Sequence, residues 1–394
     1  ILTSANLYRA NLKGANLEGA NLRDVVFQGA VFEGAFLNGA NLEGAKLKDA
    51  VFQGAVFEGA FLDGTNFLDG ADFRDADLRR TILQKINLKN IDLTGYNLEG
   101  ADLTGANLTG ANLTGANLKD AVLTDANLTG ANLKDAVLTD ANLSEANLEG
   151  AGLTGANLEG AILSGAMLDG ARLKGANFEG ADLTRAYLEG ARLEGGRLKG
   201  AILTSANLEG ANLIGADLEG AVLTDANLSE ANLEGAGLTG ANLEGAILSG
   251  AMLDGARLKG ANFEGADLTR AYLEGARLEG ARLKGANLTS ADFEGANLYD
   301  AVLTDANLTN AVLRDADLKG ADLTGANLEG AILSGAIFNS ANFRDTNLGD
   351  ANLRFADLGG ANLEGANCGT NKQCVQAVIG MDKCFREEYS NLCF

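Results

Sequence analysis

Four cysteines are the residues of this sequence best suited to covalent or metal chemistry. All of them fall near the C-terminal end of the 394-residue chain, at Cys368, Cys374, Cys384 and Cys393. Four cysteines in so short a segment predict two disulfides, with three alternative connectivities. A zinc site is the competing interpretation, but the segment has no paired CxxC spacing and the chain has no histidine. Because disulfides persist in oxidising compartments, we expect the periplasm, a lumen or the cell exterior.

The rest of the composition disfavours most other chemistry. Without histidine the chain lacks the commonest general base and metal ligand, which removes the usual catalytic triads. A net charge of −22 disfavours direct binding of nucleic acid, because phosphate contacts need clusters of lysine and arginine. No stretch approaches about 18 consecutive apolar residues, so we expect no membrane insertion. We therefore predict a protein that is not an enzyme and has no catalytic residues, cofactor or metal.

Proline is also absent from the whole chain. Average usage would supply roughly 5% proline. Proline has no backbone N–H and cannot donate to a sheet ladder. Its absence predicts that every amide of the chain is needed as a donor in one continuous hydrogen-bonded structure.

A five-residue unit, Ala-(Asn/Asp)-Leu-x-Gly, repeats along nearly the whole chain. Its central apolar residue recurs from Leu2 to Phe67 and again from Phe73 to Leu363. In an α-helix, the central apolar residues of successive units would point in different directions around the helix axis. In a plain strand they would alternate between the two faces of the sheet, because the period of five is odd. Each unit must therefore be a short extended piece followed by a corner at x-Gly, where glycine accepts a positive φ. Repeated corners wind the chain into a solenoid with alanine and leucine inward and the other three positions facing solvent.

The units ANLEG, ADLTG, ANFEG and AVLTD resemble those of the pentapeptide-repeat family over residues 1–367. This resemblance implies an all-β fold, a right-handed quadrilateral β-helix with four units in each coil. Seventy-three units then give about 18 coils, or a rod on the order of 90 Å at a strand spacing of roughly 4.8 Å.

The repeat pattern stops near residue 367, which predicts a second, smaller region at 368–394. Helix-like apolar spacing through Asn371–Tyr389 predicts a small α-helical cap over the last coil. The segment is similar to the disulfide-bracketed C-terminal helices of lumenal pentapeptide proteins from photosynthetic organisms. That resemblance implies a cyanobacterial periplasm or a thylakoid lumen.

The array is interrupted once, because one residue too many lies between Phe67 and Phe73, in 68–70. A single-residue insertion predicts a bulge in the ladder. Just beyond it, the inward first position, which is usually alanine, holds larger residues throughout one full coil. These residues are Thr81, Ile86, Ile91 and Tyr96. Residues 68–96 are therefore expected to form a swelling or bend. Local repacking of the core is the favoured interpretation, and a binding site is the alternative.

Apolar side chains occupy outward second positions in the first coils, at Val26, Val31, Phe36, Val51, Val56 and Phe61. Since residues one coil apart stack, Val31 should lie against Val51 and Phe36 against Val56. The patch is either a contact surface or a cross-strand ladder that stiffens the sheet. Leu2 also begins the array without a cap, so a partner, such as a second copy of the chain, or a preceding segment is expected to cover that end.

Residues 136–195 recur without change as 221–280. The shift between the copies is four full coils and one further unit. Each copied residue should then lie a quarter turn from its original, which argues against a long, side-specific epitope in 136–280.

We predict a rigid, acidic, non-enzymatic scaffold or protein–protein interaction module with an unknown protein partner. The alternative is a DNA-mimicking inhibitor of DNA gyrase, because the acidic array resembles the quinolone-resistance members of the family.

Overall fold

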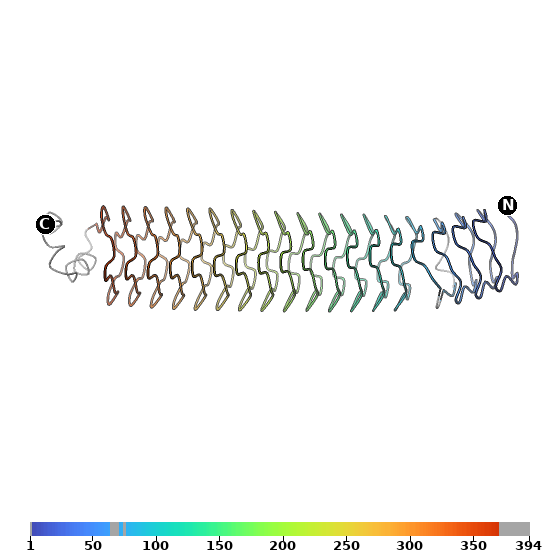
Figure 1. Cartoon of the computed structure of the whole chain (residues 1–394), viewed down its shortest axis with the longest axis horizontal. Coiled ribbons are helices and arrows are strands. Elements are labelled where there is room, and N and C mark those ends of the chain that lie inside the picture. The colour runs from blue at the N-terminus through green and yellow to red at the C-terminus, as the bar shows by residue number, and fades with distance from the viewer. Residues whose placement is uncertain (1, 64–70, 74–75, 370–394) are drawn as a thin grey trace. The chain divides into compact units, whose positions relative to one another are not determined.

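The computed structural model describes residues 2–63, 71–73 and 76–369. It divides the chain into two compact units, Ile1–Arg197 and Leu198–Phe394. The described residues contain no helix and no strand longer than an isolated bridge position. Within each unit, successive coils lie beside one another in sequence order (Figure 1). The described repeats reach Asn367, while the predicted cap lies outside the described residues and stays a prediction, as does the total number of coils.

Parallel bridges between second positions define a four-sided coil. In the first unit Asn6 pairs with Val26, four repeats further along, and the next three bridges start at Asn11, Asn16 and Asn21. In the second unit Ile202 pairs with Val222, and the same spacing continues to the bridge between Asn347 and Asn367. The predicted coil of four five-residue sides is therefore confirmed in both units.

The inserted residue changes the register only once. Val51 bridges to Asp72, Val56 to Asp77 and Phe61 to Ile82, and in each pair the partner lies one position further along than the regular spacing gives. Beyond the insertion, Ile82 pairs with Asp102 and the regular spacing returns. Residues 68–70, where we predicted a bulge, lie outside the described residues, and regular pairing beyond them begins at the bridge between Ile82 and Asp102.

The core consists of two stacked columns, alanine from the first position and leucine or phenylalanine from the third. Both columns are almost completely buried through most of the array. The Phe32 and Phe52 rings stack with centroids 4.5 Å apart, and Phe52 stacks on Phe73 at 4.7 Å. This aromatic column crosses the insertion, so the core remains continuous where the register changes.

The hydrogen bonds of one unit account for the absence of proline. In Ala126–Gly130, the first amide donates to Leu123 O at 3.0 Å and closes the corner. The second donates to Ala106 O at 2.8 Å, while the third and fifth donate to the following coil, to Asn147 O at 2.6 Å and Glu149 O at 2.9 Å. The fourth, Thr129 N–H, donates to Oδ1 of Asn127 at 3.0 Å. All five amides are used, so proline at any position would remove a bond.

The second-position side chain therefore has a structural role that the sequence analysis missed, because we expected it only to face solvent. Asparagine and aspartate are short enough to accept the amide two residues later, as in an Asx turn. Where the second position has no acceptor, the preceding coil can supply one. Glu189 N–H donates to Oδ1 of Asp169 at 2.8 Å, and its copy Glu274 donates to Asp254 at 2.8 Å.

The corners are type II turns. The third-position carbonyl accepts from the first amide of the next unit, as in Leu2 O from Ala5 N–H at 3.0 Å. Every described fifth-position residue from Ser4 to Gly365 has positive φ, which this turn requires at its third residue. Glycine adopts such angles without cost, whereas Phe355 holds φ 62 with its side chain 86% exposed.

We expect Asn142→Ala to weaken its own corner. Oδ1 of Asn142 accepts Ser144 N–H at 3.0 Å and Ser144 Oγ at 2.6 Å. Losing the acceptor should cost about 1 kcal/mol, so hydrogen exchange at the Ser144 amide should accelerate roughly fivefold. Asn142→Asp keeps the acceptor and should leave the exchange rate of the Ser144 amide nearly unchanged. The same is expected of Val122→Ala, because Val122 bridges to Asn142 from the preceding coil but does not accept the Ser144 amide. Equal acceleration in Asn142→Asp would show that the bond is unimportant.

We expect Phe355→Gly to stabilise its unit. Relief of the left-handed conformation contributes roughly 1–2 kcal/mol, and the extra chain entropy of glycine offsets roughly 0.5–1 kcal/mol of it. The denaturation midpoint should rise, while Phe355→Ala, which keeps the backbone strain, should give no comparable rise. A midpoint that rises equally in both variants would assign the effect to removal of the exposed ring instead.

Candidate functional site

The ladder of the first unit is interrupted on two neighbouring sides. Among the described residues, no bridge joins Asp72 to Asp92 or Asp77 to Asn97, although the regular spacing places bridges there. The bonds expected from Leu78 N–H to Asn97 O and from Asn97 N–H to Ala76 O are not made between these residues. The ladder closes again at the next corner, where Arg80 N–H donates to Glu99 O at 2.9 Å.

Large inward residues lie where the ladder is interrupted. Ile91 and Tyr96 occupy the first position on the two open sides, and both are only half-buried. The first position holds alanine in most other coils, so the missing bridges coincide with two unusually large inward side chains. Thr81 and Ile86 belong to the same coil but are fully buried, with Thr81 Oγ1 donating to Leu78 O at 2.5 Å. The swelling predicted for residues 68–96 is therefore confined to two sides among the described residues.

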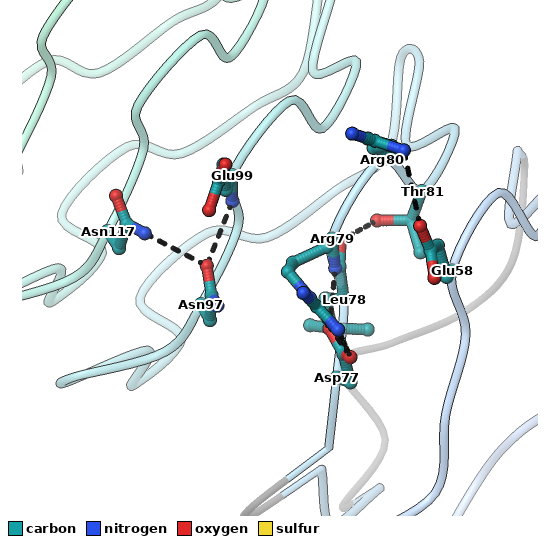
Figure 2. Close-up of polar contacts among 9 residues, drawn as sticks. All are labelled: Glu58, Asp77, Leu78, Arg79, Arg80, Thr81, Asn97, Glu99 and Asn117. Atoms are coloured by element: carbon teal, nitrogen blue, oxygen red, sulfur yellow. Dashed lines mark hydrogen bonds and ion pairs between the residues drawn. The ribbon is translucent and has the colours of Figure 1, made fainter.

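A cleft of about 560 Å³ lies at the interruption. Ala76, Asp77 and Arg79 line one wall, and Thr94, Gly95, Tyr96 and Asn97 line the other. Figure 2 shows Asp77 and Arg79 on one chain segment and Asn97 and Glu99 on another, with no polar contact drawn between them. Backbone from two successive coils thus faces the same space.

Asp77 and Arg79 form the strongest polar contact at the cleft. The Arg79 Nη2 atom lies 2.6 Å from Oδ2 of Asp77, and Nε lies 2.9 Å from Oδ1 (Figure 2). Asp77 also accepts Arg79 N–H at 3.1 Å. These bonds hold the pKa of Asp77 below its usual value, and the carboxylate raises the pKa of Arg79. Both groups therefore stay charged near neutral pH.

Further polar contacts fix the rims of the cleft. Arg80 Nη1 lies 3.4 Å from Oε1 of Glu58 in the preceding coil. On the opposite wall, Asn97 Oδ1 accepts from Glu99 N–H at 3.2 Å and from Asn117 Nδ2 at 3.1 Å. Each wall is therefore bonded to the coil behind it, which makes the cleft a defined slot between two ordered rungs.

The chemistry of the lining favours binding. Its ionised groups are mutually paired, and the remaining polar groups are a threonine, a tyrosine and an asparagine side chain. Among the described residues, no group of three or more histidine, cysteine, aspartate or glutamate side chains could hold a metal. In the same part of the chain, no helix is long and apolar enough to cross a membrane.

The structure divides the predicted N-terminal patch among four sides. Val31 bridges to Val51 and Phe36 to Val56 on neighbouring sides, so these four form one surface, which we name the apolar surface. Phe61 pairs with Ile82 on a third side, and Val26 lies on the fourth between Asn6 and Lys46. The side chains of Phe36 and Phe61 are 46% and 44% exposed. The bridges confirm the stacking predicted for the two pairs, whereas a single contact patch of all six residues stays a prediction.

Of the four cysteines, only Cys368 lies among the described residues, at the end of the repeats. Cys374, Cys384 and Cys393 lie outside them, so the predicted pairing stays a prediction.

The family sequence pattern of pentapeptide repeats matches residues 5–95 and 141–367 in overlapping segments. Together with the five-residue corners and the four-sided coils, this match shows that the chain belongs to the pentapeptide-repeat family. Proteins of this family fold as right-handed β-helices, in agreement with the predicted fold class. They are generally non-enzymatic structural or interaction proteins.

Several solved structures resemble this chain. HetL, a pentapeptide-repeat protein involved in heterocyst differentiation regulation in the cyanobacterium Nostoc, is 35% identical over 60% of this chain and 89% of its own, with a TM-score of 0.33. A thylakoid-lumen protein from Arabidopsis thaliana is 32% identical over 28% of this chain and 79% of its own, with a TM-score of 0.25. The plasmid-mediated fluoroquinolone resistance protein QnrB1 is 22% identical over 49% and 95%, with a TM-score of 0.25. No curated protein matches the chain.

We expect Arg79→Leu to raise the pKa of Asp77 towards its usual value. A carboxylate with a lowered pKa contributes stability above its unfolded pKa and loses it as pH falls through the folded one. The variant should therefore lose less stability on acidification than the parent chain. The Asp77 carboxyl can be titrated by NMR, with Arg80→Leu as the control because Arg80 pairs with Glu58. An unchanged Asp77 pKa in Arg79→Leu would contradict this assignment.

Proposed function

We propose that this protein is a rigid, non-catalytic scaffold or contact module that binds another protein through the apolar surface. The observation that carries the proposal is the pair of apolar rungs formed by Val31 with Val51 and Phe36 with Val56. Most second positions of the array hold asparagine or aspartate, whose side-chain oxygens accept the fourth-position amides in the corners. Burying apolar side chains against a partner contributes roughly 25 cal/mol per Å².

The backbone supports this role because successive coils are hydrogen-bonded to one another at the apolar surface, as in Phe32 N–H to Val51 O and Leu37 N–H to Val56 O, both at 2.7 Å. A surface held by such a ladder loses little conformational freedom on binding, which lowers the entropic cost of association. The contacts would therefore depend on fixed geometry: side chains on successive coils keep the spacing of the strands. A second copy of the chain is one such partner.

A DNA-mimicking inhibitor of DNA gyrase is the second candidate function, and the net charge of −22 favours it. Such an inhibitor would present carboxylates in place of DNA phosphates, so its effect would weaken with salt. The scaffold proposal differs because its contacts are apolar and insensitive to salt. For the scaffold function we propose an oxidising compartment, periplasm or thylakoid lumen, on the basis of the four clustered cysteines.

We expect Phe36→Asp combined with Val56→Asp to abolish partner recovery by the full chain, because charges would replace one apolar rung. Recovery from an extract of the native compartment should fall at least tenfold, with the β-type circular dichroism unchanged. Ile162→Asp, at another exposed second position, is the matched control and should not reduce recovery. Sedimentation of the same variants would reveal self-association.

Two results would overturn the scaffold proposal. One is undiminished recovery by the double variant. The other is inhibition of gyrase supercoiling by the parent chain that falls as salt is raised and is unaffected by the double variant, which would favour the DNA mimic.

A further inference from the structure

We propose that the cleft between residues 76–79 and 94–97 binds an extended, basic segment of a partner polypeptide, which completes the interrupted ladder through main-chain hydrogen bonds. This inference rests on the proposed function in assuming a protein partner, but it concerns a different site from the apolar surface.

The interrupted rungs define the chemistry of the ligand. On the intact face of the same coil, Leu98 N–H donates to Asn117 O at 2.7 Å and Asn117 N–H donates to Tyr96 O at 2.9 Å. The equivalent bonds between residues 76–78 and Asn97 are not made. Two backbone edges of parallel-sheet type therefore face one cleft. A strand edge is a template for an added strand, and main-chain bonds supply the affinity of such complexes.

The side chains of the cleft favour a peptide over a small charged ligand. Its carboxylate and guanidinium are already paired, at 2.6 Å between Asp77 Oδ2 and Arg79 Nη2. A small anion or cation would have to break this pair. An extended peptide instead bonds to the backbone edges and leaves the ion pair at the rim intact.

The apolar surface leads directly to the cleft. Val56 bridges to Asp77, which lines the cleft, and Val51 bridges to Asp72 on the neighbouring side. A polypeptide seated in the cleft could therefore continue over Val56 and Phe36. This continuity joins a main-chain site to an adjacent apolar contact and fits a protein partner.

Charge near the cleft selects a basic segment. Among the residues that the structure describes, the carboxylates of Glu58, Asp77 and Glu99 outnumber the two nearby guanidinium groups of Arg79 and Arg80, in a chain whose net charge is −22. Lysine side chains flanking the bound strand would be attracted by this field, most strongly at low salt.

The test uses the full chain and a blocked synthetic peptide of two Ala-Asn-Leu-Lys-Gly units as the probe. With saturating peptide, hydrogen exchange at the Leu78 and Asn97 amides should slow at least tenfold. A peptide of the same sequence, N-methylated at alternate residues, keeps the side chains but loses donors and should bind at least tenfold more weakly. No slowing by the first peptide, or equal binding of the second, overturns the proposal.

A matched pair of variants tests the cause of the opening. Ile91→Ala combined with Tyr96→Ala restores the small inward residue on both open sides, so the two amides should exchange slowly without peptide and peptide affinity should fall at least tenfold. Ile86→Ala, at a fully buried position outside the cleft lining, should bind peptide within twofold of the parent chain. Full binding by the double variant would overturn the proposal.

The two hypotheses can fail separately. If the peptide does not bind but Phe36→Asp with Val56→Asp still abolishes partner recovery, only the cleft proposal is overturned. If the peptide binds as expected and the double aspartate variant recovers its partner undiminished, the apolar surface is overturned and the cleft is retained.

Discussion

Hydrogen bonding of the backbone amides is the constraint on which the rest of this structure depends. A repeat unit uses one amide to close its corner and three to join the coils before and after it. The remaining amide, at the fourth position, lies in the corner and needs an acceptor from a side chain. Asparagine and aspartate at the second position meet this need, which explains both their frequency and the absence of proline.

The candidate site lies where this constraint is relaxed. Throughout most of the array, small inward alanines allow coils to approach to hydrogen-bonding distance. Ile91 and Tyr96 are larger than alanine, and no bridge of the regular spacing forms beside them among the described residues. The apolar surface is a second departure from the regular repeat. There, valine and phenylalanine replace the asparagine or aspartate that accepts the fourth-position amide in the corner. At each departure the regular pattern is lost locally, and backbone or apolar groups face solvent.

The sequence predicted the repeating geometry well, because a five-residue period is incompatible with a helix or a plain strand. The four-unit coil, the inward alanine and leucine columns, and the pairing of Val31 with Val51 all agree with the structure. Side-chain contacts within a corner could not be predicted from periodicity, so the role of Asn127 as an acceptor was missed. The absence of proline was the available signal, since it implied that the fourth amide also needs a partner. Size alone also failed to separate Ile86, which is buried, from Tyr96, which borders the cleft.

The register across the insertion has a consequence for how such a chain can change length in evolution. The bridged pairs that flank the extra residue are one position further apart than elsewhere, and the regular spacing is restored within one coil. Gain or loss of whole units requires no such accommodation, because each corner is stabilised by its own residues and its immediate neighbours. The repeated segment 136–195 and 221–280 is what recombination between similar coding stretches would leave behind. Insertions or deletions of multiples of five residues therefore preserve the register of the coils. An insertion or deletion of any other length leaves a local irregularity on which selection can act.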